Sequence, residues 1–66
     1  MERNLRLNWP DIIKEAVKRR KEQGLTQEQL ATLVGVSKPT LSSFEQGKTS
    51  ITLSNAIKVL HALGLD

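Results

Sequence analysis

The sequence predicts a small all-α domain, a compact bundle of four or five short helices. In several stretches, apolar residues recur every three or four positions, which is the spacing of one helix face. Ser, Thr or Asn stands before these stretches and Gly after them, as expected of helix N-caps and helix ends. A length of 66 residues allows one domain with a small core. We therefore expect an N-terminal arm over residues 1–8 and one domain over residues 9–66.

The first helix should run from about Trp9 to Gln23. Pro10 suits a first-turn position, because the amides of that turn have no partner within the helix, and either Asn8 or Trp9 is the cap. Gly24 ends the helix. The face predicted to turn inward carries Ile13, Ala16, Val17 and, as its one charged member, Arg20.

A second helix should begin after Thr26, which forms a capping-box pair with Gln29 three positions later. Its apolar face is predicted to contain Leu30, Leu33 and Val34. Gly35 follows directly and is expected in the left-handed conformation that ends a helix, which glycine adopts at little cost. These residues predict a short helix followed by a tight turn.

Ser37 is predicted to open the third helix. Since Pro39 has no N–H, the Ser37 hydroxyl should cap the amide of Thr40. Leu41 and Phe44 are spaced to face inward. The outer side is then left to the residues Lys38, Pro39, Ser42, Ser43 and Gln46.

The fourth helix should be capped by Thr52 or Ser50 and should end before Gly64. It is apolar round more than half of its circumference, which is more than a four-helix monomer needs to bury. The apolar positions are Leu53, Ala56, Ile57, Val59, Leu60 and Leu63. We expect one face to close the core and another to meet a second subunit, with His61 on the polar side as an ordinary surface residue.

The composition narrows the function classes. There is no cysteine and only one histidine, and the sequence has no phosphate-binding glycine loop and no metal-ligand spacing. These features argue against an enzyme, a metal site or a bound cofactor. The N-terminal stretch lacks a long apolar run, so neither a signal peptide nor a membrane span is expected. We expect a cytoplasmic protein.

The charge distribution is compatible with a polyanionic partner. The net charge is +3, and seven of the ten basic residues lie in the first 21 positions: Arg3, Arg6, Lys14, Lys18, Arg19, Arg20 and Lys21. A basic balance agrees with DNA or another polyanion as the ligand. A solvated helix face with interleaved Asp11, Glu15 and Glu22 explains the charge about equally well.

The stretch from Thr26 to Gln46 resembles the helix-turn-helix of the lambda-repressor-like, Cro/C1-type DNA-binding domains, also called the XRE family. The similarity spans roughly Ile12 to Leu65, and small, glycine and apolar positions fall in register along it. The residues that carry it are Gln27, Ala31, Gly35, Leu41 and Phe44, the flanking stretch Gly24-Leu25-Thr26-Gln27 and the stretch Glu45-Gln46-Gly47-Lys48.

The resemblance implies double-stranded DNA as the ligand, with the third helix in the major groove. Phosphate contacts are implied for Gln27, Ser37, Gln46, Gly47 and Lys48, and base contacts for Lys38, Pro39, Thr40, Ser42 and Ser43. In some members of the family a basic arm touches the DNA backbone; Arg3 and Arg6 could do so here, although we favour a disordered tail.

The resemblance also implies a structural ion pair. In the family, an arginine four residues before the glycine that ends the first helix pairs with a glutamate at the end of the recognition helix. These residues would be Arg20 and Glu45. The alternative is that Arg20 lies at the edge of the domain and touches phosphate or water.

The function expected from these features is that of a sequence-specific transcriptional regulator, most simply a repressor. It would bind a two-fold operator as a homodimer, at half-sites about 34 Å apart, and would be nucleoid-associated. The C-terminal stretch from Ile51 resembles short antitoxin regulators that pair with kinase toxins, so a toxin is a possible partner. The alternative is an interaction module that docks a partner protein through the fourth helix.

Overall fold

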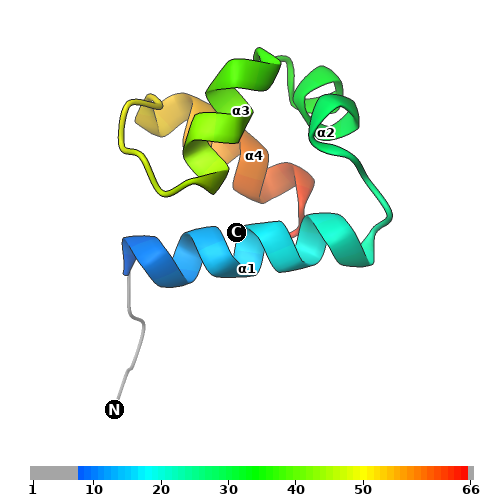
Figure 1. Ribbon diagram of the computed structural model, residues 1–66, viewed down its shortest axis with the longest axis horizontal. Coiled ribbons are helices and arrows are strands. Elements are labelled where there is room, and N and C mark those ends of the chain that lie inside the picture. The colour runs from blue at the N-terminus through cyan, green and yellow to red at the C-terminus, as the bar shows by residue number, and fades with distance from the viewer. Residues whose placement is uncertain (1–7, 66) are drawn as a thin grey trace.

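The computed structural model describes residues 8–65, which form four helices: α1 (Trp9–Glu22), α2 (Gln27–Val34), α3 (Lys38–Glu45) and α4 (Leu53–Ala62). Figure 1 shows α1 along one side of the domain, α2 and α3 on the opposite side of the domain, and α4 behind α3. Within the described residues, α3 packs against α1 and α2, and α2 packs against α4. The predicted all-α class is confirmed. The predicted arm, with Arg3 and Arg6, lies outside the described residues except for Asn8.

Each helix begins at a capping residue that the sequence had offered. Asn8 caps α1, since its Oδ1 accepts from the Asp11 amide at 3.3 Å, and Trp9 is instead the first helical residue. Thr52 caps α4 by accepting from the Asn55 amide at 3.1 Å. Each of these bonds satisfies a first-turn amide that has no partner within the helix. The two open alternatives are thereby settled in favour of Asn8 and Thr52.

The two central helices have the caps that were predicted for them. At α2, the Gln29 amide donates to Thr26 Oγ1 at 3.0 Å, and the Thr26 amide donates to Gln29 Oε1 at 2.8 Å, which completes the capping box. At α3, the Thr40 amide donates to Ser37 Oγ at 3.1 Å. Local polar contacts therefore fix where each of these helices begins.

The end of α3 turns at Gly47, whose φ is +87°. The Gly47 amide donates to the Phe44 carbonyl at 2.9 Å and the Lys48 amide to the Ser43 carbonyl at 3.1 Å. This pair of bonds is the Schellman arrangement, which requires a left-handed residue at the turn. An L-residue at position 47 would cost about 1–2 kcal/mol in that conformation. The turn thus directs the chain away from α3 toward the connector before α4.

The core is formed by all four helices. Phe44 and Leu41 of α3 and Leu30 of α2 are almost fully buried, as are Val59 of α4 and Leu63 directly after it. The inward orientation predicted for Leu41 and Phe44 is confirmed. The remaining buried residues are Ile13, Ala16, Ala31 and Ala56. Because α3 is anchored from within by two of the largest core side chains, its opposite face is directed outward.

Leu33 lies outside the core, although it shares the apolar spacing of Leu30 and Val34. Its side chain is 65% exposed, whereas Leu30 is fully buried and Val34 is half-buried. Ala31 is buried as well, so the buried face of α2 is centred between Leu30 and Ala31 and is turned away from Leu33. The spacing rule placed Leu33 next to Leu30 but could not say on which side of Leu30 the core lay.

The fourth helix has more apolar surface than the core uses. Ala56 and Val59 are buried, but Leu53 is 77% exposed and Ile57 is 49% exposed. These two residues are four positions apart and lie on one face of α4. The predicted surplus of apolar surface on this helix is confirmed.

Candidate nucleic-acid interface

An ion pair joins the last turn of α1 to the end of α3. Arg20 Nε donates to Glu45 Oε2 at 2.7 Å and Arg20 Nη2 donates to Glu45 Oε1 at 3.1 Å. The third donor, Arg20 Nη1, reaches the Leu25 carbonyl at 2.8 Å. The two side chains are only 11% and 7% exposed. The pair implied by the resemblance is thus present, in the two-bond geometry that suits a guanidinium and a carboxylate.

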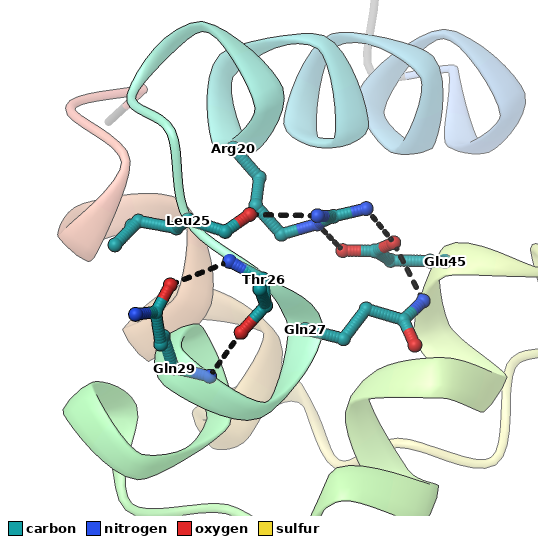
Figure 2. Close-up of polar contacts among 6 residues, drawn as sticks. All are labelled: Arg20, Leu25, Thr26, Gln27, Gln29 and Glu45. Atoms are coloured by element: carbon teal, nitrogen blue, oxygen red, sulfur yellow. Dashed lines mark hydrogen bonds and ion pairs between the residues drawn. The ribbon is translucent and has the colours of Figure 1, made fainter.

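Gln27, at the start of α2, joins the same carboxylate. Its Nε2 donates to Glu45 Oε1 at 2.9 Å, so Glu45 accepts hydrogen bonds from α1 and from α2 (Figure 2). An amide nitrogen carries two hydrogens. One is used by Glu45, which leaves one N–H of Gln27 for another acceptor. We call Arg20, Gln27 and Glu45 the polar brace.

The polar brace fixes the position of α3 relative to the two preceding helices. A buried charge without its partner is costly, and breaking such a pair by removing one member typically destabilises a protein by about 3–5 kcal/mol. The brace also neutralises Glu45, the one acidic residue of α3. The outer surface of α3 therefore carries no uncompensated negative charge.

The outer face of α3 contains the five residues expected to contact bases. Lys38 and Pro39 are exposed, and Thr40, Ser42 and Ser43 are half-buried. Two of the hydroxyls already have local partners. Ser37 Oγ donates to Thr40 Oγ1 at 2.7 Å, and Gln46 Nε2 donates to Ser42 Oγ at 3.3 Å. Lys38 is the residue of this face with an exposed cationic group.

The residues expected to contact phosphate lie at both ends of the helix pair. Gln27 stands at the first position of α2, and Gln46 and Lys48 are exposed after α3. The amides of Gly47 and Lys48 were expected to bind phosphate, yet both donate to carbonyls of α3. Likewise, the Ser37 hydroxyl is used within its cap. The groups left at this surface for an anion are the Lys48 ammonium and the side chains of Gln27 and Gln46.

Trp9 supports the end of α3 in a way that the sequence reasoning missed. Its indole Nε1 donates to the Gly47 carbonyl at 2.9 Å, and its ring meets Phe44 edge-on at 5.6 Å between centroids. A tryptophan that is partly buried usually finds an acceptor for its N–H. The signal in the sequence was that the single Trp stands at the start of a helix. Its partner, 38 residues away, could not be deduced from local patterns.

Other kinds of site find no support among residues 8–65. In that range no three His, Cys, Asp or Glu side chains are grouped so that they could hold a metal ion. No helix of the described chain is long and apolar enough to cross a membrane.

The helices α2 and α3 are short and are joined by a glycine turn. The outer face of α3 is polar, and α1 braces its end. This arrangement defines a helix-turn-helix protein. The comparison with known proteins agrees: the helix-turn-helix family matches residues 18–66. This match covers well over half of the chain. The protein therefore belongs to the Cro/C1-type helix-turn-helix family.

Two relatives are similar in sequence to this chain. One, from Haemophilus influenzae, is 40% identical over 63 residues, which are 96% of this chain and 61% of the relative. Another, from Methanothermobacter thermautotrophicus, is 49% identical over 45 residues, which are 68% of this chain and 65% of the relative. Both are named as uncharacterized HTH-type transcriptional regulators, and neither is named as an enzyme. The chain thus spans less than two thirds of the length of these relatives.

Proposed function

We propose that the protein is a transcriptional regulator that binds double-stranded DNA in a sequence-specific manner with α3 in the major groove. The observation that carries this proposal is the outer face of α3. That face is polar and free of acidic side chains from Lys38 to Ser43, while the opposite face is anchored in the core by Leu41 and Phe44. A helix fixed from behind and polar in front is suited to reading base edges.

The side chains of this face support a modest direct readout. The Lys38 ammonium can donate to guanine O6 and N7, and Pro39 offers a rigid apolar surface to a thymine methyl group. Thr40, Ser42 and Ser43 are short and suit more than one base. The face has no Arg, Asn or additional Gln that would bind one base through two fixed bonds, so DNA shape and half-site spacing should supply much of the remaining specificity.

Affinity would come from phosphate contacts at both ends of the helix pair. The free N–H of Gln27 lies at the positive end of α2, where an anion is favoured. Glu45 accepts from the same amide, but its charge is neutralised by Arg20, so it would not repel an approaching phosphate. Lys48 and Gln46 supply the contacts beyond α3. Ser37 and Gly47, with their side-chain or backbone donors engaged, contribute mainly by shaping the helix ends.

A homodimer would complete the site. One recognition helix reads only a few base pairs, whereas two copies related by a two-fold axis would read half-sites about 34 Å apart. The exposed Leu53 and Ile57 of α4 support a second copy of this chain as the partner, because together they form an apolar face that the monomer leaves uncovered. Bound across a promoter at the nucleoid, such a dimer would act as a repressor by occlusion.

The apolar face of α4 that contains Leu53 and Ile57 also supports an alternative function. In this second candidate, α4 docks a partner protein such as a toxin, and the chain acts as an antitoxin or interaction module. The two candidates differ in their response to salt, because DNA binding weakens steeply as salt rises and apolar docking does not. Sedimentation of the purified protein, with and without Ile57→Lys, separates self-association from capture of another chain.

The experiment that tests the proposal is selection from a pool of random duplexes followed by sequencing of the bound fraction. We expect an enriched two-fold sequence whose enrichment is lost on Lys38→Ala or Ser43→Ala. Lys58→Ala, on the solvent side of α4, serves as the matched control and should keep the enrichment. Binding without any enriched sequence would overturn sequence-specific regulation and would favour the docking alternative.

A further inference from the structure

Charged and polar side chains on two sides of α1 differ in whether they form contacts within the protein. On one side, Arg19 Nη1 and Gln23 Nε2 both donate to the Leu63 carbonyl, at 3.5 and 3.4 Å. Arg19 Nε also pairs with Glu15 at 3.3 Å. The side chains on this side therefore form intramolecular contacts that hold the end of α4 against α1.

The solvent-facing side of α1 carries three lysines, interleaved with Asp11 and Glu22. Lys14, Lys18 and Lys21 are spaced four and three residues apart, so they form one row along the helix, which we call the lysine row. All three are exposed. Within residues 8–65, the structure gives none of their side chains a hydrogen bond or an ion pair.

The lysine row begins beside the proposed DNA-binding surface. Lys14 lines an open hollow together with Gln46 and Gly47, at the end of α3. The row therefore begins at one of the regions that are expected to grip phosphate and continues along α1 for about two turns.

The folded monomer gains little from this arrangement. Like charges four residues apart, such as Lys14 and Lys18, destabilise a helix slightly. Lys21 lies in the last turn, where a cation complements the helix dipole, but Lys14 lies in the first half of α1 and has no such role. A ligand with repeated negative charges would turn the repulsion within the row into attraction.

We propose that the lysine row is a third phosphate-contact surface, which binds the DNA backbone next to the segment read by α3. The row presents three ammonium groups over about 10 Å of helix at 1.5 Å per residue, so it can neutralise at most three phosphates. This inference rests on the proposed DNA-binding function. It assigns to α1 a part of the affinity that is independent of base sequence.

The test uses the triple variant Lys14→Gln, Lys18→Gln, Lys21→Gln and measures the Kd for the selected operator and for an unrelated duplex between 50 and 200 mM salt. Each phosphate contact contributes about 0.9 to the slope of log K against log salt concentration. We expect the triple variant to reduce the magnitude of this negative slope by up to about 2.7, for three lost contacts, on both duplexes, with the ratio of the two Kd values unchanged. The triple Lys→Arg variant, which keeps the charges, should restore the wild-type slope.

Lys58→Gln is the matched control, because it removes an exposed lysine from α4 and should leave the slope unchanged. Thermal unfolding shows that each variant remains folded. A triple variant with the slope of wild type, or one that loses affinity only for the operator, would overturn the role of the row while leaving the proposed function intact. Wild-type protein without any salt-dependent DNA binding would overturn both.

Discussion

The two ends of α3 are held very differently. At the C-terminal end, Glu45 is bonded to α1 and α2, Phe44 packs against Trp9, and the Gly47 carbonyl accepts from the Trp9 indole. At the N-terminal end, Lys38 and Pro39 are exposed, and no tertiary hydrogen bond involves their side chains among the described residues. We call the C-terminal end of α3 the braced end, and the N-terminal end, whose side chains can contact a ligand, the available end.

This difference is what a reading helix requires. A binding group must be presented with little freedom, which demands that its supporting residues be locked by packing and hydrogen bonds. The braced end provides that support through side chains that do not themselves need to touch a ligand. The exposed end can then vary in sequence with little effect on folding. If α3 reads DNA as proposed, stability and recognition belong to opposite ends of one eight-residue helix.

Removing the brace should have the largest effect. Arg20→Met leaves Glu45 buried without its ionic partner, and we expect a loss of about 3–5 kcal/mol in unfolding free energy, measured by urea denaturation. The double variant Arg20→Met, Glu45→Met should recover much of this loss, because a buried pair replaced by apolar groups is often nearly neutral. A loss below about 1 kcal/mol for the single variant, the range of exposed pairs, would contradict a supporting role of the brace.

A change at the available end should act on binding and not on folding. We expect Lys38→Ala to lower, by about 1–3 kcal/mol, the difference in binding free energy between the operator and a duplex in which its guanine is changed to another base. Competition binding measures this difference. The unfolding free energy of the variant should stay within about 0.5 kcal/mol of wild type, as for most surface substitutions. Equal weakening on both duplexes would instead assign Lys38 to a phosphate.

A subtler change at the braced end sharpens the comparison. Trp9→Phe keeps an aromatic ring against Phe44 but removes the indole donor to the Gly47 carbonyl. We expect a loss of about 0.5–1.5 kcal/mol, the usual net value of one hydrogen bond, in the free energy of unfolding. Pro10→Ala, an exposed neighbour in the same turn, is the control. A Trp9→Phe variant as stable as wild type would show that the bond to Gly47 is dispensable.

A small effect on both stability and binding is expected at Gln27, which belongs to the polar brace and is also proposed to contact phosphate. Gln27→Ala removes one of the hydrogen bonds to Glu45 but leaves both bonds from Arg20, so the fold should lose no more than about 1 kcal/mol. Its affinity should fall for operator and unrelated duplex alike, because a phosphate contact carries no sequence information. Titration of both duplexes at one salt concentration measures this, and a loss confined to the operator would contradict it.

Much of the fold followed from local patterns in the sequence. Thr26 with Gln29, and Ser37 with Thr40, fixed the helix starts, because capping involves residues three positions apart. The Arg20–Glu45 pair was anticipated through the family resemblance and not through spacing. Contacts over long distances in the sequence, such as Trp9 with Gly47 and Gln27 with Glu45, were missed, since no local rule selects the partner. The exposure of Leu33 did not follow from the sequence, because helical spacing identifies a face but not the direction of the core.

The central proposal is that the available end of α3 reads DNA sequence. The direct measurement is the ratio of the Kd values of wild-type protein for an unrelated duplex and for the selected operator at physiological salt. We expect a ratio of about 10³ or more, the lower limit of specific DNA-binding proteins. A ratio near one, with both affinities vanishing at moderate salt, would contradict it and leave only electrostatic attraction to DNA.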